Sequence, residues 1–493
     1  PFRYFSYINK TTFYKIFLAP GITVVISLCI NIHFRAKSVK LNPDGRRYLN
    51  LSTPSNPFIK FTPEKNGILL NQENTFDVLL KISSEVENSP KKTERLPLNL
   101  SLVIDRSGSM NGEPLEEAKK CASMLVDRMS EKDRLSVVTY ESHAEVLVTS
   151  QPVSHKSRLK SQIRGITTGG MTALYDGWSL GAEEVAKNSN DNFISRVLLL
   201  SDGQANRGLT DDDVIASHCR KMAEAGVTTS TYGLSEHFNE NLMAGMASAG
   251  QGQAHYGQTA EDLMDPFQEE FDLLEALLAR RMMLRILPEK GVNFEVLNGY
   301  SQDKEGRFIM PDLAFGADVW ALLRIKVNAD LCSEKLGSKL KLLSAYVDYL
   351  DQDGADQRSD TSKMTIDLCT QEQFAVLEAD ETVQLRTAEV RAATLQENAQ
   401  VAARAGNWSE VDKIMVELDA LGKDNEWIKV SVERLRSYSE AREQESFSKE
   451  TLYKSRRMKQ RRVAKNEARF SIASESMKPS YLRRKTEQGK REL

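Results

Sequence analysis

The chain has 493 residues, and at roughly 150 residues per domain this length predicts about three domains. Its hydrophobic share of 40% and charged share of 27% are ordinary for a globular protein. The net charge of −3 is unevenly spread, because residues 451–493 hold 14 Lys and Arg against 4 Asp and Glu. The five cysteines show no CxxC spacing, which argues against a zinc site.

An uncharged apolar stretch occupies residues 16–30, behind the basic residues Arg3, Lys10 and Lys15. It is shorter than the ~20 residues of a spanning helix, but it fits the core of a signal peptide. We therefore expect residues 1–35 to be a signal peptide or an N-terminal membrane anchor, in a membrane-associated, secreted or periplasmic protein. Basic residues after the stretch oppose export by the positive-inside rule, so a cytoplasmic location stays open.

Strand and helix patterns alternate from about residue 97 to residue 275, which favours a mostly parallel sheet with helices on both faces. The expected strands are Leu98–Ile104, Leu135–Tyr140, Val197–Leu200, Val227–Tyr232 and Ala254–Tyr256. The expected helices are Leu115–Met129, Thr172–Ala186, Asp212–Ala225, Glu240–Ala249 and Glu261–Leu277.

Strand patterns also come before this segment, at 58–61 and 75–82, and after it, from 281 to 368. We therefore expect an α/β domain with a doubly wound, mostly parallel sheet, inserted in a β-sandwich and followed by a C-terminal helical region. The expected boundaries are 58–94 and 279–370 for the sandwich, 95–278 for the α/β domain, 381–445 for the helical region and 446–493 for a basic tail.

The segment Asp105-Arg106-Ser107-Gly108-Ser109 follows a buried strand and carries a carboxylate and two hydroxyls at alternate positions. These can direct three hard oxygen donors at one point, which suits a small divalent cation such as Mg²⁺. Two further loops follow strands at the same edge of the sheet, where open α/β sheets bind ligands. The glycine-rich loop supplies Thr172, and the loop after the most apolar strand supplies Asp202.

These residues resemble the von Willebrand factor type A (VWA) domain with its metal-ion-dependent adhesion site. The family pattern is Asp-x-Ser-x-Ser, a threonine after a glycine-rich loop and an aspartate after a later strand. The chain matches all five positions, with Asp105, Ser107, Ser109, Thr172 and Asp202. The resemblance covers roughly residues 95–275, and the flanking strands are similar to those of bacterial membrane-associated or secreted VWA proteins.

The resemblance implies a Rossmann-like VWA fold and metal-dependent, adhesion-type binding of a protein ligand. Ser107 and Ser109 would coordinate Mg²⁺ or Mn²⁺ directly, with Ca²⁺ as a further candidate. Asp105 and Asp202 would act directly or through water, and Thr172 would change between the two modes. An Asp or Glu of the partner would complete the coordination. The alternatives are an adaptor or scaffold for an AAA+ ATPase of the MoxR or chelatase type, and a metal that is purely structural.

No catalytic motif stands out in the sequence, so we expect a binding protein rather than an enzyme. The histidines lack HExxH spacing, no serine lies in a GxSxG elbow, and no GxxxxGK[ST] loop is present. The basic tail has too few aromatic residues for a base-stacking platform, so nucleic acid is not an expected partner. Membrane association through the N-terminus is the other expected contact.

Overall fold

The computed structural model describes residues 12–17, 23–28, 39–41, 47–49, 56–84, 95–202, 204–234, 238–257, 264–315, 317–333, 336–423, 425–460 and 463–464. Residues Pro1–Pro54 form a unit of their own with two antiparallel strand pairs, β1 (Thr12–Phe17) with β2 (Thr23–Leu28) and β3 (Val39–Leu41) with β4 (Arg47–Leu49). The rest of the expected signal peptide or anchor, 1–35, lies outside the described residues. No helix within the described ranges is long and apolar enough to cross a membrane.

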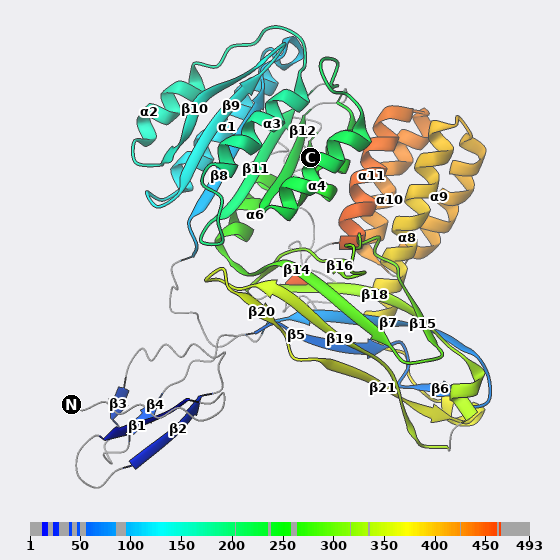
Figure 1. The fold of residues 1–493 in the computed structure, drawn as a ribbon. Helices are drawn as coiled ribbons and strands as arrows, with labels where there is room; N and C mark the ends of the chain where they lie inside the picture. The colour runs from blue at the N-terminus through cyan, green and yellow to red at the C-terminus, as the bar shows by residue number, and fades with distance from the viewer. Residues whose placement is uncertain are drawn as a thin grey trace. The chain divides into compact units, whose positions relative to one another are not determined.

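A six-stranded sheet forms the centre of the α/β domain (Figure 1). Its order is β10 (Ala144–Pro152), β9 (Arg134–Tyr140), β8 (Leu98–Asp105), β11 (Ile194–Ser201), β12 (Val227–Leu234) and β13 (Gln251–Gly257). Neighbouring strands are parallel except β10, which is antiparallel to β9. The chain order runs outward in both directions from β8, as in a doubly wound sheet. The reversal falls between β8 and β11, where such sheets bind ligands.

Helices cover both faces of this sheet, as the sequence predicted. One face packs against α1 (Glu113–Arg128), α2 (Lys156–Arg164) and α6 (Met264–Glu275). The other packs against α3 (Leu174–Ala186), α4 (Asp212–Glu224) and α5 (Glu240–Ala249). The residues of β8 alternate between the two cores, because Leu102 and Ile104 face the first group while Val103 faces the second. The mostly parallel α/β sheet is therefore confirmed.

Two further sheets share one apolar core, with residues such as Val78 and Leu323 on one sheet and Leu284 and Val347 on the other. The first contains β16 (Phe308–Ile309), β14 (Leu277–Pro288), β19 (Lys339–Leu350), β21 (Ser362–Cys369) and β6 (Gly67–Leu69), with β17 (Leu313–Ala314) on β14 and β20 (Asp356–Arg358) on β19. The second contains β15 (Val292–Val296), β18 (Ala317–Val327), β7 (Asn74–Ser83) and β5 (Phe58–Pro63), with β22 (Val463–Ala464) on β18. Since β7 precedes the α/β domain and pairs with β18 after it, the α/β domain is an insertion.

The C-terminal helices form a separate core that includes residues of α8 (Glu381–Arg404), α9 (Trp408–Gly422), α10 (Glu426–Ala441) and α11 (Gln444–Gln460). A short α7 (Gln371–Ala375) precedes them. Two residues of α8, Val383 and Val390, pack against Trp320 and Leu322 of β18. The helical region was expected to end at residue 445, and this boundary is wrong, because α11 continues to Gln460.

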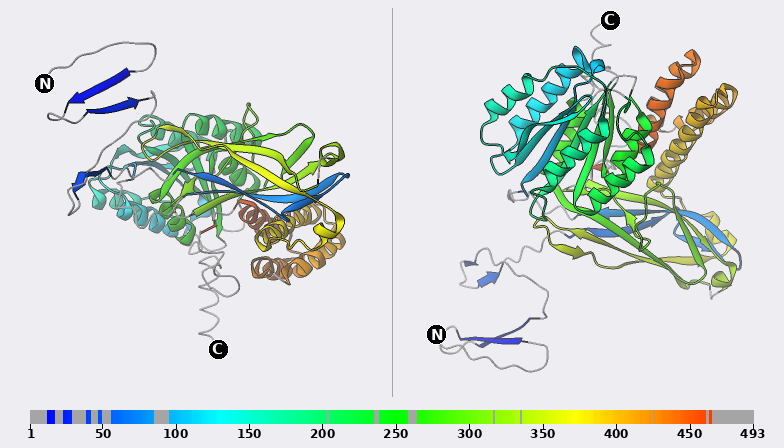
Figure 2. Two further views of the ribbon diagram at one scale, coloured as in Figure 1. Left: turned by 90° about the horizontal axis from the view of Figure 1, so that it is seen from below. Right: turned by 45° about the horizontal axis from the view of Figure 1, so that its top comes forward.

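Residues 446–460, expected to begin a basic tail, instead lie in α11 between the α/β domain and the other helices (Figures 1 and 2). Tyr453 is stacked on Tyr256 with 5.6 Å between ring centroids, and Arg456 donates a hydrogen bond of 2.6 Å to the carbonyl of Ala244. Basic composition alone did not indicate this burial, because long Arg and Lys side chains can cover apolar surface with their methylene groups. The remainder of the tail, 465–493, lies outside the described residues.

A buried ion-pair network joins the α/β domain to the sheets that flank it. Arg196 of β11 is only 2% exposed and pairs with Glu270 of α6. Its second amino group lies 3.1 Å from the Asp312 carboxylate, which also accepts a hydrogen bond from the backbone N–H of Arg281 in β14. The network therefore fixes the last helix of the α/β domain against both its own sheet and β14.

We predict that Glu270→Ala lowers the free energy of unfolding by about 3–5 kcal/mol, because it leaves Arg196 buried without its principal partner. Urea-induced unfolding measures the change. Asp272→Ala is the matched control on the same helix, since Asp272 is 58% exposed in its ion pair with Arg128. The control should cost less than about 1 kcal/mol. Equal losses in both variants would contradict the assigned role of the network.

Candidate metal centre

The first loop of the candidate site begins where β8 ends. Asp105 is fully buried, and its carboxylate accepts hydrogen bonds from the Ser107 backbone N–H at 2.9 Å and the Ser201 hydroxyl at 2.7 Å. Parallel pairing sets Leu200 of β11 beside Ile104 of β8, so the next residue of each strand, Ser201 and Asp105, also meet. The sheet register therefore orients the Asp105 carboxylate.

Three oxygen atoms form a continuous chain across the ends of β8 and β11. The hydroxyl oxygens of Ser107 and Ser109 lie 3.2 Å apart, and the Ser109 hydroxyl donates a hydrogen bond of 2.8 Å to the Asp202 carboxylate. Ser107 and Asp202 are buried, whereas Ser109 is exposed. The cluster is therefore open to solvent on the side of Ser109.

Thr172 is held in place by hydrogen bonds between all three loops. Its backbone N–H donates to the side-chain oxygen of Asn206 in the third loop, at 2.9 Å. The carbonyl of Gly170 accepts a hydrogen bond of 3.2 Å from the N–H of Gly108, which ties the glycine-rich loop to the first loop. Thr172 is 4% exposed and lies two residues before α3, rather than at its first residue as expected.

Glycines bring the second loop to this position. Gly170 has a φ of +76°, and a Cβ atom there would lie 1.5 Å from a carboxylate oxygen of Glu141. On α3, a Cβ at Gly177 would lie 2.4 Å from the Tyr140 ring, and one at Gly181 would lie 2.3 Å from Val103. α3 can therefore pack close to the sheet, and this places the glycine-rich loop that precedes α3 near the carboxyl ends of the strands.

The buried Asp105 carboxylate is not compensated by a basic side chain. Burial raises its pKa, and hydrogen bonds from Ser201 and Ser107 act in the opposite direction without cancelling the effect. Among the described residues, no Lys or Arg forms an ion pair with Asp105. A cation bound nearby would stabilise the charged form of this carboxylate.

The donor atoms fit a small divalent cation. Adjacent ligands in a Mg²⁺ octahedron with bonds of 2.0–2.1 Å lie about 2.9 Å apart. The separations of 3.2 Å between the Ser107 and Ser109 hydroxyls and 2.8 Å between Ser109 and Asp202 are close to this value. Hydroxyl and carboxylate oxygens are also the donors that Mg²⁺ and Mn²⁺ prefer.

Among the described residues, no group of three or more His, Cys, Asp or Glu could hold a metal ion. Two histidines in the described part of the α/β domain serve in contacts with aromatic rings. His218 lies 2.9 Å from the Tyr175 hydroxyl, and His255 is stacked on Tyr232 with 4.9 Å between ring centroids. Neither contact supplies a base to a nucleophilic serine or cysteine.

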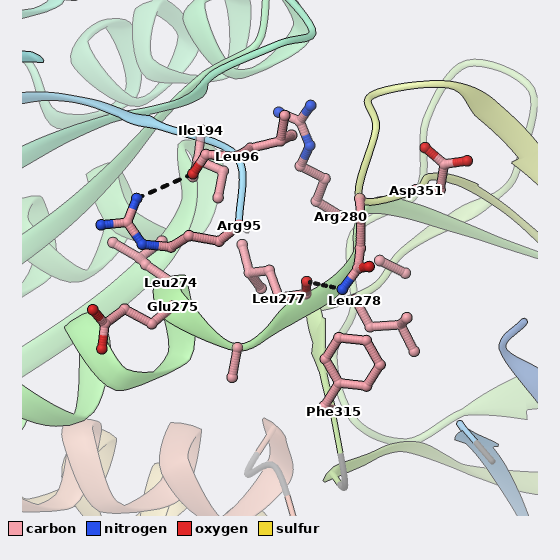
Figure 3. Close-up of a pocket in the computed structure, with 13 residues that line it drawn as sticks. Arg95, Leu96, Ile194, Leu274, Glu275, Leu277, Leu278, Arg280, Phe315 and Asp351 are labelled. Atoms are coloured by element: carbon pink, nitrogen blue, oxygen red, sulfur yellow. Dashed lines mark hydrogen bonds between the residues drawn. The ribbon is translucent and has the colours of Figure 1, made fainter. Parts of the chain in front are cut away.

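A cavity of about 270 Å³ lies where α6 passes into β14 (Figure 3). Its lining includes Leu96 before β8 and Ile194 at the start of β11, so it lies at the amino ends of these strands. The candidate metal centre lies at their carboxyl ends. Charged residues of both signs, Arg280 and Asp351 among them, line the cavity. The cavity is therefore separate from the candidate metal centre.

Sequence reasoning missed the residues that support the cluster. The Ser201 hydroxyl donates the hydrogen bond that orients the Asp105 carboxylate. The side-chain oxygen of Asn206 accepts the hydrogen bond that holds the Thr172 backbone. Ser201 directly precedes Asp202, and this adjacency was a usable signal once the strand register was known. Asn206 had no such signal, because it lies in an irregular loop far from Thr172 in the sequence.

Comparison with known proteins identifies the α/β domain. Residues 99–269 match the family described as the von Willebrand factor type A domain. An uncharacterized protein of Synechocystis is 32% identical over 40% of this chain and 46% of its own length, and the uncharacterized protein YfbK of Escherichia coli is 30% identical over 42% and 36%. The chain thus spans less than half the length of these two relatives.

One solved structure is similar to this chain in fold over more than the matched domain. The von Willebrand factor type A protein from Catenulispora acidiphila has a TM-score of 0.58 at 14% identity, covering 77% of this chain and 90% of its own. The aligned part of the chain is longer than residues 99–269, so elements outside the α/β domain are also similar in fold to this structure. Residues 99–269 of the chain therefore form a von Willebrand factor type A domain.

Proposed function

We propose that the chain is a metal-dependent protein-binding module of the adhesion type. The metal, Mg²⁺ or Mn²⁺, would be held by Asp105, Ser107, Ser109, Thr172 and Asp202. The observation that carries the proposal is the chain of three oxygens from Ser107 through Ser109 to Asp202, spaced as adjacent ligands of a small divalent cation.

Each residue has a defined part in this proposal. Ser107 and Ser109 present neutral hydroxyl oxygens, and Asp202 presents a carboxylate beside them. Asp105 is held by Ser107 and Ser201 and supplies buried negative charge beneath the loop. A cage with only two carboxylates leaves a bound divalent ion able to accept a further anionic oxygen. An Asp or Glu side chain of a partner protein supplies that oxygen.

A binding role is favoured over catalysis by the neighbours of the two serines. The Ser107 and Ser109 hydroxyls contact each other, and Ser109 also donates to Asp202, whereas no histidine of the described ranges is bonded to either hydroxyl. The histidine base that activates the serine of a Ser-His-Asp triad is therefore not beside either hydroxyl. We therefore propose that the serines serve as metal ligands.

Ser109→Ala should weaken Mg²⁺ binding by about tenfold or more, since even an indirect support of a metal site is worth about 10–100-fold in affinity. Ser109 is exposed, so its loss removes a donor with little effect on the core. Calorimetric titration measures the affinity. Ser161→Ala, on exposed α2 surface of the same domain, is the control and should bind as the wild type does. Equal affinity in all three proteins would refute the assigned ligand set.

Adjacent glycines give a second test of the site. Gly170→Ala should lower Mg²⁺ affinity by about tenfold, because a φ of +76° strains any side chain and the Glu141 carboxylate would have to move. Gly169→Ala is the matched control, since nothing lies within 4 Å of a Cβ atom there. Both are measured by the same titration. Indifference of metal binding to Gly170→Ala would show that the glycine-rich loop does not contribute to the site.

The recognition of an acidic partner can be tested with a displayed library of peptides that carry one fixed aspartate. In Mg²⁺ the protein should retain these peptides and reject the same library with asparagine in place of the aspartate. EDTA and Ser109→Ala should abolish retention. Equal retention of both libraries would contradict carboxylate recognition. If the protein shows no metal-dependent binding but associates with an AAA+ ATPase in the presence of ATP, the adaptor alternative is correct instead.

A further inference from the structure

Helix α11 of the C-terminal region packs against the α/β domain beside its edge strand β13. The ring centroid of Tyr453 lies 5.6 Å from that of Tyr256 in β13 and 6.2 Å from that of Phe238, which precedes α5. The amino nitrogen of Lys449 lies 5.0 Å from the centroid of the Phe238 ring, within the range of a cation–π contact. Tyr453 therefore packs against the apolar core that contains Phe238 of the α/β domain and Ile215 of α4.

Polar contacts from the helical region also hold α5. Arg404 at the end of α8 pairs with the carboxylate of Glu240, in the first turn of α5, at 2.5 Å. Arg456 of α11 donates its hydrogen bond of 2.6 Å to the carbonyl of Ala244, in the middle of α5. Two helices of the C-terminal region therefore fix the position of α5 on the sheet.

The cap of α5 is bonded to the start of α4. The side-chain oxygen of Asn239 accepts hydrogen bonds of 3.1 Å from the backbone N–H groups of Asn241 and Leu242, which caps α5. The amide nitrogen of the same Asn239 donates to the carboxylate of Asp212, in the first turn of α4, at 3.3 Å. A shift of α5 would therefore also move the point where the third loop enters α4.

The third loop connects this point to the candidate metal centre. It begins with Asp202 directly after β11 and ends at Asp211, which caps α4. Within it, Asn206 makes two hydrogen bonds with Thr172, since its side-chain oxygen accepts from the Thr172 N–H at 2.9 Å and its own N–H donates to the Thr172 carbonyl at 3.2 Å. The placement of Thr172 beside Asp202 therefore depends on a loop whose far end is anchored at α4.

We infer that α11 is a positioning element of the metal centre, with Tyr453 as its principal positioning residue. α11 holds Phe238 and α5, α5 holds the start of α4, and α4 holds the far end of the third loop. The C-terminal helical region thereby sets the metal affinity of the α/β domain, although none of its residues is a candidate ligand. The inference rests on the proposed function, because it concerns the metal centre assigned there.

The test compares two substitutions of one residue in the full chain. Tyr453→Ala removes the ring from the Phe238 and Tyr256 contacts and should weaken Mg²⁺ binding about tenfold in a calorimetric titration. Tyr453→Phe keeps the ring and removes only a buried hydroxyl that has no hydrogen-bond partner among the described residues, so it should bind Mg²⁺ as wild type does. Glu270→Ala destabilises the same domain at the amino ends of the strands and should also keep the wild-type Mg²⁺ affinity.

Coupling between two sites is reciprocal, so metal binding should in turn stabilise the docking of α11. Hydrogen exchange of the backbone amides of residues 449–456 in the wild type should be slower in Mg²⁺ than in EDTA. This measurement needs no substitution in α11, so it tests the inference even where Tyr453→Ala does not fold. Unchanged exchange in this segment on addition of saturating Mg²⁺ would overturn the inference.

The readouts separate this inference from the proposed function. Equal Mg²⁺ affinity in wild type and folded Tyr453→Ala overturns the role of α11 and leaves the proposed function standing. An equal loss of affinity in Tyr453→Ala and Glu270→Ala overturns it as well, because the effect then follows from a general loss of stability. Absence of Mg²⁺ binding in the wild type itself overturns the proposed function and this inference with it.

Discussion

The structure depends on the reversal of strand order between β8 and β11. The segment after β8 leads into α1 on one face of the sheet, whereas the segment after β11 leads into α4 on the other. Because the two connections leave in opposite directions, the strand ends between them stay uncovered, and polar groups of both loops can converge there. Asp105 and Asp202 follow from this topology, since each stands at or directly after the end of one of the two strands.

Preorganisation is the second property of the site. Backbone and side-chain hydrogen bonds connect all three loops, through Gly108 to Gly170 and through Thr172 to Asn206. The donor oxygens are held together by these contacts and by the sheet register that orients Asp105. Because these contacts already order the loops, binding at this site would cost little further loop entropy.

Much of the α/β domain was predictable because its signals are local. The strand expected at Leu98–Ile104 is β8 with one residue more, and the helix expected at Glu240–Ala249 has the bounds of α5. The edge strand β10 was not predicted, since its residues are mostly exposed or half-buried and show no clean alternation. The sequence did not predict that α11 packs in the fold, because its residues are mostly basic and polar. The contacts of Tyr453 and Arg456 with the α/β domain are visible only in the structure.

The candidate site also combines residues that the local sequence pattern predicts with residues that only the tertiary fold brings together. The five candidate ligands could be named from spacing because they follow strands in a recognisable order. The network of Arg196, Glu270 and Asp312 could not, because its members come from β11, α6 and the segment before β17, which only the tertiary fold brings together. Asn206 and Ser201 were missed for the same reason. Local pattern therefore predicts the candidate donors, whereas only long-range packing shows which residues hold them in place.

The most direct test of the account is a crystal structure of the protein grown with Mn²⁺, with diffraction recorded at a wavelength where manganese scatters anomalously. The account predicts an anomalous peak between the Ser107 and Ser109 hydroxyls and the Asp202 carboxylate, within bonding distance of these oxygens. A crystal with Mn²⁺ bound elsewhere, or with these oxygens still hydrogen-bonded to one another and no peak between them, would contradict it.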